Sequence, residues 1–462
     1  MPQSHPGAEP PAAGRPAGKP GGGPAGPPAA AQPEEAEVLR HLLRSPGYLK
    51  LLGFCALIGV PVSLAAFWFL VALHKVEHAL WTDIPEALGH DTPPWWWPLP
   101  LLLLAGTVVG LVAKHLRGGG GHVPASGLHT GGATSAALPG VVIAALACLP
   151  FGAVLGPEGP LIALGGGLAV LFRNLAQVPA TAQSTALMGA AGAAAAVAAI
   201  FGNPLVAAVL LIEVAGVGGP QLFAVMLPAL LSSGVGSLVF TGLGRWTGLA
   251  TGNLSVHHGG PLPRLDAADV VWAVVIAGAL AVALHPVLAG ARAIAGYVAA
   301  RPFVRTVLCA LGAAACACLY ALITGRSPGE VALSGQATLA TLAADPHAWG
   351  VGALLAVLLF KGVAYALCLG SLRGGPVFPA LFLGAVAGVL LAPLPGLGAV
   401  PAMAAGLAAA AAATLRLPVS SVVLVVLLLG SAAMMPVVIL AVVVAFVVTE
   451  LLPVAPGAPA AP

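Results

Sequence analysis

Long apolar runs follow one another from residue 51 to residue 453, and short segments rich in glycine and proline interrupt them. The runs cover residues 51–73, 98–115, 137–155, 160–176, 184–200, 203–217, 220–242, 267–298, 304–324, 350–369, 376–397, 400–414, 417–431 and 433–453. Several are shorter than the ~20 residues that a helix needs to cross the hydrocarbon core of a bilayer. Short or broken apolar helices in both halves of a chain indicate a transport site built from discontinuous helices.

The composition is typical of an integral membrane protein. Of its 462 residues, 59% are hydrophobic and 7% are charged, whereas soluble domains carry about 25% charged residues. No series of alternating ten-residue segments is present, so the backbone hydrogen bonds are expected to be satisfied within helices rather than in a barrel. The net charge of +3 is too small to indicate a nucleic-acid partner. We predict an all-α integral membrane protein.

The two ends of the chain differ from the apolar region between them. Residues 1–36 are rich in proline, glycine and alanine and lack an apolar segment, which predicts a disordered tail rather than a signal peptide. The basic residues Arg40, Arg44 and Lys50 precede the first apolar run and favour a cytoplasmic N-terminus. Residues 454–462 are predicted to be a short tail, with no C-terminal soluble domain. A multi-pass protein of the cell (plasma) membrane is expected.

The residue pattern indicates neither a metal, nor a cofactor, nor covalent chemistry. The six cysteines all fall in apolar runs and form no CxxC pair, so we expect them to pack as small hydrophobic side chains. An intramembrane protease would need a nucleophile beside a base, or a pair of aspartates, at membrane depth. No such pairing stands out in the sequence. We therefore expect no metal, no cofactor and no enzymatic activity.

One carboxylate lies where a membrane segment is expected. Glu158 occupies the middle of "GPEGP" (156–160), within a very apolar stretch. Ionisable groups at membrane depth are rare, costly and usually functional. The preceding glycine and proline place Glu158 at a helix start, where unpaired N–H groups and the positive end of the helix dipole stabilise a carboxylate or a bound anion alike. An inert capping role is the alternative, but the position favours a gate that works by competition.

Three other titratable residues stand out, and two of them admit more than one interpretation. Glu213 ends an apolar run and is either an interface residue or part of a proton route. His122 follows four glycines and precedes Pro124, so it either contacts an anion, carries protons, or forms local hydrogen bonds. Lys361 is expected to extend its ammonium group to the membrane surface from a helix end.

Three breaks in the apolar pattern resemble, in order and spacing, the central motifs of the CLC family of chloride channels and proton-coupled chloride exchangers. "GGHVP" (120–124) is similar to the family's GSGIP stretch, "GPEGP" (156–160) to its G(K/R)EGP stretch, and "GPVFP" (375–379) to its GxFxP stretch. "FGNPLVAAVLLIE" (201–213) and "AAAAATLRLPVSSVVLVV" (409–426) resemble two further family segments. The ordered set is much more specific than any one motif.

The resemblance covers about residues 45–450, and it implies an architecture and a site. It implies a homodimer with one anion pathway per subunit, and about eighteen tilted or half-spanning helices in two inverted repeats. We place the transmembrane domain at residues 37–453, with a first repeat at about 46–245 and a second at about 266–453. Glu158 would be the external gate, which occupies an anion site when charged and leaves it when protonated or displaced. The implied anion pathway consists of Gly120, Gly121, His122, Val123, Pro124, Gly156, Pro157, Gly159, Pro160, Gly375, Pro376, Val377 and Phe378.

The anion ligands implied by the resemblance are altered in this chain. Gly121 stands where the family places an anion-coordinating serine, and His122 replaces a glycine. Pro157 replaces a basic residue, which removes a nearby positive charge. Pro376 falls where an amide is expected to face the anion, and proline has no N–H. Val377 takes the place of the family's phenylalanine, although a phenylalanine follows directly.

The proton route implied by the resemblance is altered as well. Aligned on Glu213, the family's internal proton-transfer glutamate is replaced by Val214. No tyrosine follows Tyr365, so the inner-gate tyrosine near the C-terminus is absent. A proton route then requires Glu213 or His122 as a substitute relay. Loss of the serine and tyrosine favours leak over occlusion of the anion.

These features together predict an anion channel, or a uniporter with weak proton coupling, gated by Glu158 and carrying chloride. The alternatives are a chloride/proton antiporter with a relocated proton pathway, and a CLC-type transporter for another anion such as fluoride, bicarbonate or nitrate. The expected partners are a small anion, protons in the antiporter case, the lipid bilayer and a second copy of the chain. No nucleic acid is expected.

Overall fold

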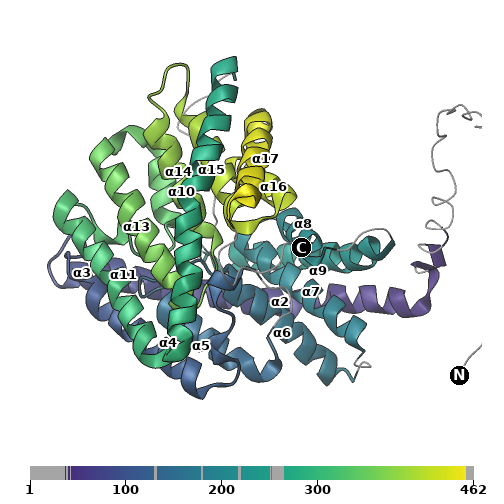
Figure 1. Ribbon diagram of the computed structural model, residues 1–462. Helices are drawn as coiled ribbons and strands as arrows, with labels where there is room; N and C mark the ends of the chain where they lie inside the picture. The colour runs from purple at the N-terminus through teal and green to yellow at the C-terminus, as the bar shows by residue number, and fades with distance from the viewer. Residues whose placement is uncertain are drawn as a thin grey trace, which may run out of the picture.

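The protein is helical throughout the part of the chain that its structure, a computed structural model, describes (Figure 1). The described residues are 43–128, 133–177, 181–216, 220–249 and 265–453, together with residues 37, 40, 41 and 251. The tails predicted at residues 1–36 and 454–462 lie outside them. The elements that build the molecule are α2 (Pro46–His78), α3 (Ile84–Ala87), α4 (Pro98–His115), α5 (Leu138–Cys148), α6 (Glu158–Leu175), α7 (Ala182–Phe201), α8 (Pro204–Ala215), α9 (Pro220–Thr247), α10 (Ala267–Ala300), α11 (Pro302–Thr324), α12 (Gln336–Ala344), α13 (Val351–Ser371), α14 (Val377–Leu391), α15 (Ala399–Leu415), α16 (Pro418–Leu429) and α17 (Met435–Leu451).

Most of the apolar helices fall into two length classes, as the apolar runs predict. Within the described residues, eight helical segments are long and apolar enough to cross a membrane. They contain α2, α4, α7, α9, α10, α11, α13 and α17. Helices α5, α8, α14, α15 and α16 are apolar but have only 10–17 residues, so they end at membrane depth if they lie across the bilayer.

Proline and glycine set many helix boundaries. Helices α4, α8, α11 and α16 each begin at a proline, because that residue needs no N–H partner in the first turn and its φ already suits a helix. Helices α7 and α8 end before Gly202 and Gly216, whose φ values are 63° and 59°. Glycine adopts this left-handed conformation without steric cost, and it closes the last turn. The interruptions in the apolar pattern are therefore real ends of helices.

We call "GPEGP" (156–160) and "GPVFP" (375–379) the two central breaks. The helices that follow them pack in the same way. Helix α6 meets α7 at Gly165 and Gly192, and α14 meets α15 at Gly384 and Gly406. In each pair a Cβ atom on either glycine would overlap the carbonyl oxygen of the other. Small residues let backbones approach closely, which is the main source of helix packing where lipid replaces water. The match of the two pairs supports the predicted pair of related halves.

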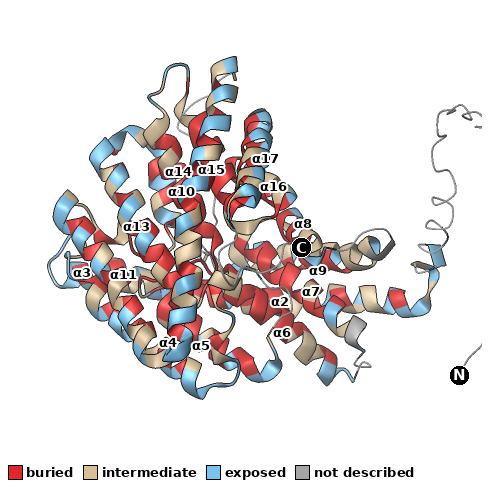
Figure 2. Cartoon of the chain, viewed as in Figure 1, coloured by how far each residue is buried: buried red, intermediate tan, exposed pale blue. Residues whose placement is uncertain are grey.

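Buried residues gather where these helices meet (Figure 2). Helices α14 and α15 are buried along most of their lengths. The outer helices instead expose large apolar side chains, such as Leu238 on α9 at 76% exposure and Leu359 on α13 at 62%. A surface of this kind suits contact with hydrocarbon rather than water. The core therefore lies around the two breaks and positions the segments that hold Glu158.

Replacing Gly384 with alanine tests the close approach of α14 and α15. The added methyl group would meet the Gly406 carbonyl oxygen, so the two helices must separate. Overpacking of this kind lowers the free energy of unfolding by about 1–3 kcal/mol. The melting temperature of the detergent-solubilised protein should therefore fall. Gly278→Ala in α10 is the control, because its Cβ would meet nothing within 4 Å; equal melting of both variants would contradict the packing described.

Candidate functional site

The two central breaks pair with each other through their backbones. The Gly156 N–H donates to the Gly375 carbonyl oxygen over 2.9 Å, and the Gly375 N–H donates to the Gly156 carbonyl oxygen over 2.6 Å. The pair is an isolated antiparallel bridge. It joins the segment before α6 to the segment before α14, so both helix N-termini face one point. A side chain at either glycine would overlap the Glu158 carboxylate.

The Glu158 side chain lies at this point and is 1% exposed. Its Oε1 accepts the Val377 N–H over 2.5 Å and the Phe378 N–H over 3.3 Å. Its Oε2 is buried and has no hydrogen-bond partner. A buried oxygen without a partner is energetically costly, so the carboxylate is held firmly at one oxygen only. The site therefore provides donors for a negative charge, but not for both oxygens of the Glu158 carboxylate.

The donors that hold Glu158 are backbone groups at a helix N-terminus. Val377 and Phe378 are the first two residues of α14, whose N–H groups have no partner within the helix. The positive end of the helix dipole adds to their attraction for an anion. A free anion could take the same position if the carboxylate left. Chemically, a pair of N–H groups of this kind suits one negatively charged group.

The position of Pro376 corrects one expectation. Its missing N–H was expected to remove a donor facing the anion, but α14 begins after Pro376 and the donors are Val377 and Phe378. The Pro376 carbonyl oxygen instead accepts the Tyr365 hydroxyl over 2.5 Å. Phe378 stacks on Phe201, with ring centroids 5.8 Å apart. The proline thus leaves the pair of donors intact.

Tyr365 and Phe201 are supporting residues that the sequence did not single out. Tyr365 is fully buried on α13, and its hydrogen bond fixes the turn into α14. Phe201 closes α7 and packs against the ring of Phe378. For Tyr365 the sequence held a usable signal, a tyrosine within the apolar run that precedes "GPVFP" (375–379). The contact between Phe201 and Phe378 joins distant segments and leaves no local pattern.

A cavity of about 30 Å³ brings together residues of all three motifs. Its walls include Gly120, Gly121, His122, Pro124, Gly159, Pro160, Arg373, Gly374 and Pro376. The volume suffices for a water molecule or a small ion. His122 is exposed at its edge, and Val123, which precedes Pro124, is not among the residues that line it. The cavity lies directly beside the first turn of α6, which begins with Glu158.

The glycine run at residues 118–121 has a backbone that side chains would strain. Its φ values are 76°, 57°, 78° and 99°, all in the left-handed region that favours glycine. The Gly121 N–H donates to the Gly118 carbonyl oxygen over 2.9 Å, so this amide closes the turn. The segment lines the cavity with backbone alone, where the family's serine would add a hydroxyl.

Arg373 supplies a positive charge to the cavity, and sequence reasoning missed it. Its Nε donates to the Gly119 carbonyl oxygen over 3.1 Å and its Nη1 to that of Leu372 over 3.2 Å. Among the described residues, no carboxylate lies within ion-pair distance of Arg373. The guanidinium thereby connects the glycine run to the segment directly before "GPVFP" (375–379). Its sequence signal was a basic residue directly before Gly374.

Glu213 lies away from this cavity and binds another helix end. Its Oε1 accepts the Val419 N–H over 2.9 Å, and its Oε2 accepts the Ser420 N–H over 2.7 Å and the Ser420 hydroxyl over 2.6 Å. These groups belong to the first turn of α16, where a carboxylate offsets unpaired donors. Val214 packs against an apolar cluster. Both carboxylate oxygens of Glu213 are therefore engaged in a cap.

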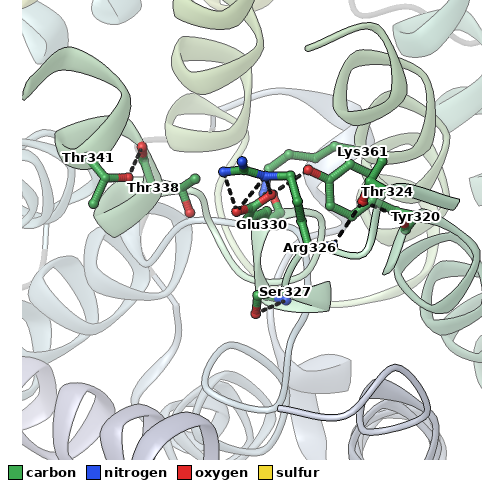
Figure 3. A network of polar contacts seen from close by, with 9 residues as sticks. Tyr320, Thr324, Arg326, Ser327, Glu330, Thr338, Thr341 and Lys361 are labelled. Carbon is green, nitrogen blue, oxygen red and sulfur yellow. Dashed lines mark hydrogen bonds and ion pairs between the residues drawn. The ribbon is translucent and has the colours of Figure 1, made fainter. Parts of the chain in front are cut away.

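Lys361 corrects a second expectation, because it does not reach the membrane surface. Its side chain is fully buried, and its Nζ donates to the carbonyl oxygens of residues 330–333 over 3.0–3.3 Å. Figure 3 shows this group beside Glu330, whose carboxylate accepts from Arg326 Nε over 2.8 Å and from the Tyr320 hydroxyl. A buried ammonium group requires such compensation. Lys361 thus holds a loop in place.

The loop held by Lys361 supports the segment that leads to Glu158. The Leu333 N–H donates to the Gly152 carbonyl oxygen over 3.2 Å. The ammonium also lies 4.8 Å from the ring centroid of Phe382 on α14. Lys361 therefore connects the approach to α6 with the body of α14.

Comparison with known proteins covers most of the chain. A family model described as voltage gated chloride channel matches residues 128–450, which contain the second and third motifs; residues 120–124 precede the match. Proteins named YfeO, described as ion-transport proteins, are 26% identical in Salmonella schwarzengrund and 27% in Salmonella newport over 350 residues. Each alignment spans 72% of this chain and 78% of the relative.

Solved structures share the fold. A slow cyanobacterial Cl⁻/H⁺ antiporter superposes with a TM-score of 0.71 at 18% identity, covering 87% of this chain and 94% of the other. A CLC-type fluoride/proton antiporter superposes with a TM-score of 0.61 at 18% identity, covering 87% of this chain and 95% of the other. At this identity the likeness concerns the fold.

Removing the Lys361 ammonium should unfold the loop that it holds. In Lys361→Met, buried carbonyl oxygens lose their donor, and each unsatisfied group is worth about 1–3 kcal/mol. We expect the free energy of unfolding to fall by about 3 kcal/mol or more. Lys114→Met, at an exposed position on α4, is the matched control and should melt as the wild type does. Similar thermal melting of the two variants in detergent would show that the loop does not depend on Lys361.

Proposed function

Because this chain belongs to the voltage-gated chloride channel (CLC) family, we propose that it carries chloride across its membrane as a channel, or as a uniporter with weak proton coupling, gated by Glu158. It is a multi-pass membrane protein of an anion-transport family. The observation that carries the proposal is the Glu158 carboxylate on the Val377 and Phe378 N–H groups. We place it in the plasma membrane as a homodimer with a cytoplasmic N-terminus.

Gating follows from competition for the two N–H groups. When Glu158 is charged, its Oε1 occupies the donors and excludes a free anion. When it is protonated, the attraction of the helix N-terminus for it falls, and an anion can replace it. Charge on the gate and occupancy by the anion are then alternatives. The unpartnered Oε2 supports a carboxylate that can leave this position.

The cavity beside α6 provides the next position for an anion. It combines backbone of the glycine run with the Arg373 guanidinium, and it reaches Gly159 in the first turn after Glu158. A positive side chain without a carboxylate partner attracts small anions into a narrow space. The cavity and the amide pair together form the pathway that we propose.

Weak proton coupling is supported by the surroundings of Glu213. Coupled exchange needs a titratable relay besides the gate. Both oxygens of Glu213 are bound at the first turn of α16, and the neighbouring Val214 carries no proton. His122 is exposed beside the glycine run and is one candidate for such a relay.

A proton-coupled antiporter is the second candidate, and one cavity favours it. A space of about 180 Å³ is lined by His74 and Glu77 as well as by Pro157, the residue before Glu158. These two side chains could exchange protons with the gate from that side. The Cl⁻/H⁺ and fluoride/proton antiporters that share the fold are consistent with this alternative. Fluoride or bicarbonate would then be candidate anions as well.

Glu158→Gln tests the gate. Hydrogen bonds to a charged group contribute about 1.5–3 kcal/mol, so a neutral side chain should compete with the anion less well. We expect chloride efflux from reconstituted vesicles at neutral pH to rise about tenfold or more, and its activation by acid to disappear. Glu86→Gln, at an exposed position on α3, should leave both unchanged. Acid activation that persists in Glu158→Gln would place the gate elsewhere.

Simultaneous tracking of protons and chloride tests the coupling. A chloride gradient across vesicles containing the protein should drive chloride movement with no stoichiometric uphill movement of protons. Glu213→Gln should leave the pH dependence of chloride efflux unchanged and lower stability by about 1 kcal/mol, as expected for a weakened helix cap. Stoichiometric uphill proton movement that Glu213→Gln abolishes would instead support the antiporter and overturn the channel or uniporter.

A further inference from the structure

A second cavity adjoins the first one at Pro124, Gly127 and Pro376, which line both. Its volume is about 90 Å³. Most of its other walls come from α10 and α15, which pack against each other (Figure 1). They include Arg292 on α10 and residues 413–416 at the C-terminal end of α15. The second cavity is therefore the neighbouring space of the first one on this side.

Arg292 brings an uncompensated charge to this second cavity. It lies on α10, and its Nε is buried without a hydrogen-bond partner. Among the described residues, no carboxylate lies within ion-pair distance of it. Another cation, Arg416, lies close enough for the two charges to repel each other. The half-buried guanidinium therefore has a buried Nε without a partner and no counter-charge among the described residues.

Arg416 adds a second guanidinium to this cavity, and its backbone is strained. It ends α15 with a φ of 55°, a left-handed conformation that costs free energy for any residue with a Cβ. Gly202 holds the corresponding position after α7 without such a cost. Arg416 has one carboxylate neighbour, Glu450, with Nη1 and Oε1 3.6 Å apart. Glu450 offsets one of the two charges, and the other remains.

Thr414 contributes a hydroxyl that is free to donate. Helical threonines usually return this hydrogen bond to the carbonyl four residues earlier, as Thr107, Thr247, Thr324 and Thr449 do over 2.7 Å. The Thr414 Oγ1 is buried and makes no hydrogen bond. It lines the same cavity as Arg292 and Arg416.

We propose that the second cavity binds a small monovalent anion between Arg292, Thr414 and Arg416. The site differs from the amide pair beside Glu158 because side-chain charges and a hydroxyl hold the ligand. A single net positive charge suits a halide or a small oxyanion rather than a multivalent one. The anion is the transported one, so this identity rests on the proposed function. The site concentrates it beside the first cavity.

Titration of the full chain in detergent with chloride, at constant ionic strength and neutral pH, tests the site. Each variant of the second cavity keeps Glu158 and the amide pair, so a difference in heat between the wild type and a variant reports the second cavity. Arg292→Gln should raise the half-saturating chloride concentration about tenfold or more, and Thr414→Val, which keeps the shape of the side chain, about threefold. Arg301→Gln, an exposed arginine after α10, should bind as the wild type does.

Chloride efflux from vesicles, measured against chloride concentration, separates this inference from the proposed function. Equal half-saturation in the wild type, Arg292→Gln and Thr414→Val would overturn the second site, leave the gate at Glu158 standing, and mean that water fills the cavity. Chloride binding that depends on Arg292, without efflux in any variant, would support the site and overturn the transport proposal. If Arg292→Gln fails to elute as a folded protein, Thr414→Val decides.

Discussion

Two backbone hydrogen bonds between Gly156 and Gly375 determine the geometry at the centre of this protein. They hold the starts of α6 and α14 together, although these helices come from opposite halves of the chain. The N–H groups of Val377 and Phe378 therefore point at the Glu158 carboxylate. Because the donors belong to the backbone, their direction does not depend on a side-chain rotamer. The helices behind them, packed through glycines, keep this arrangement rigid.

The CLC-type fold and family predicted from the sequence are confirmed, because both depend on local patterns: apolar runs, Gly/Pro breaks and their order. The details of the site depend on contacts between distant segments, and these were less predictable. Arg373 bonds to Gly119 in the other half, and no periodicity reveals that contact. The effect of Pro376 depended on where α14 begins, and a shift of one residue decides which N–H groups face the carboxylate. Sequence spacing does not fix a helix start this finely.

Four charged side chains that are buried or half-buried differ in how completely they are compensated. Lys361 and Glu213 have full sets of partners in backbone carbonyls and helix N–H groups, and both serve to hold segments together. Glu158 has one satisfied oxygen, and Arg292 has an orphaned Nε. In a medium of low dielectric, incomplete compensation is expensive. The two incomplete sites are the ones proposed to exchange partners with a mobile ion.

The four carbonyl oxygens around the Lys361 Nζ make a cage that resembles the coordination of a monovalent cation. In this protein the cation is covalently attached to α13. Its occupancy is therefore independent of the salts on either side of the membrane, whereas a bound ion would come and go with them. The loop at residues 330–333 is therefore held by a charge that no change in the surrounding salts can remove.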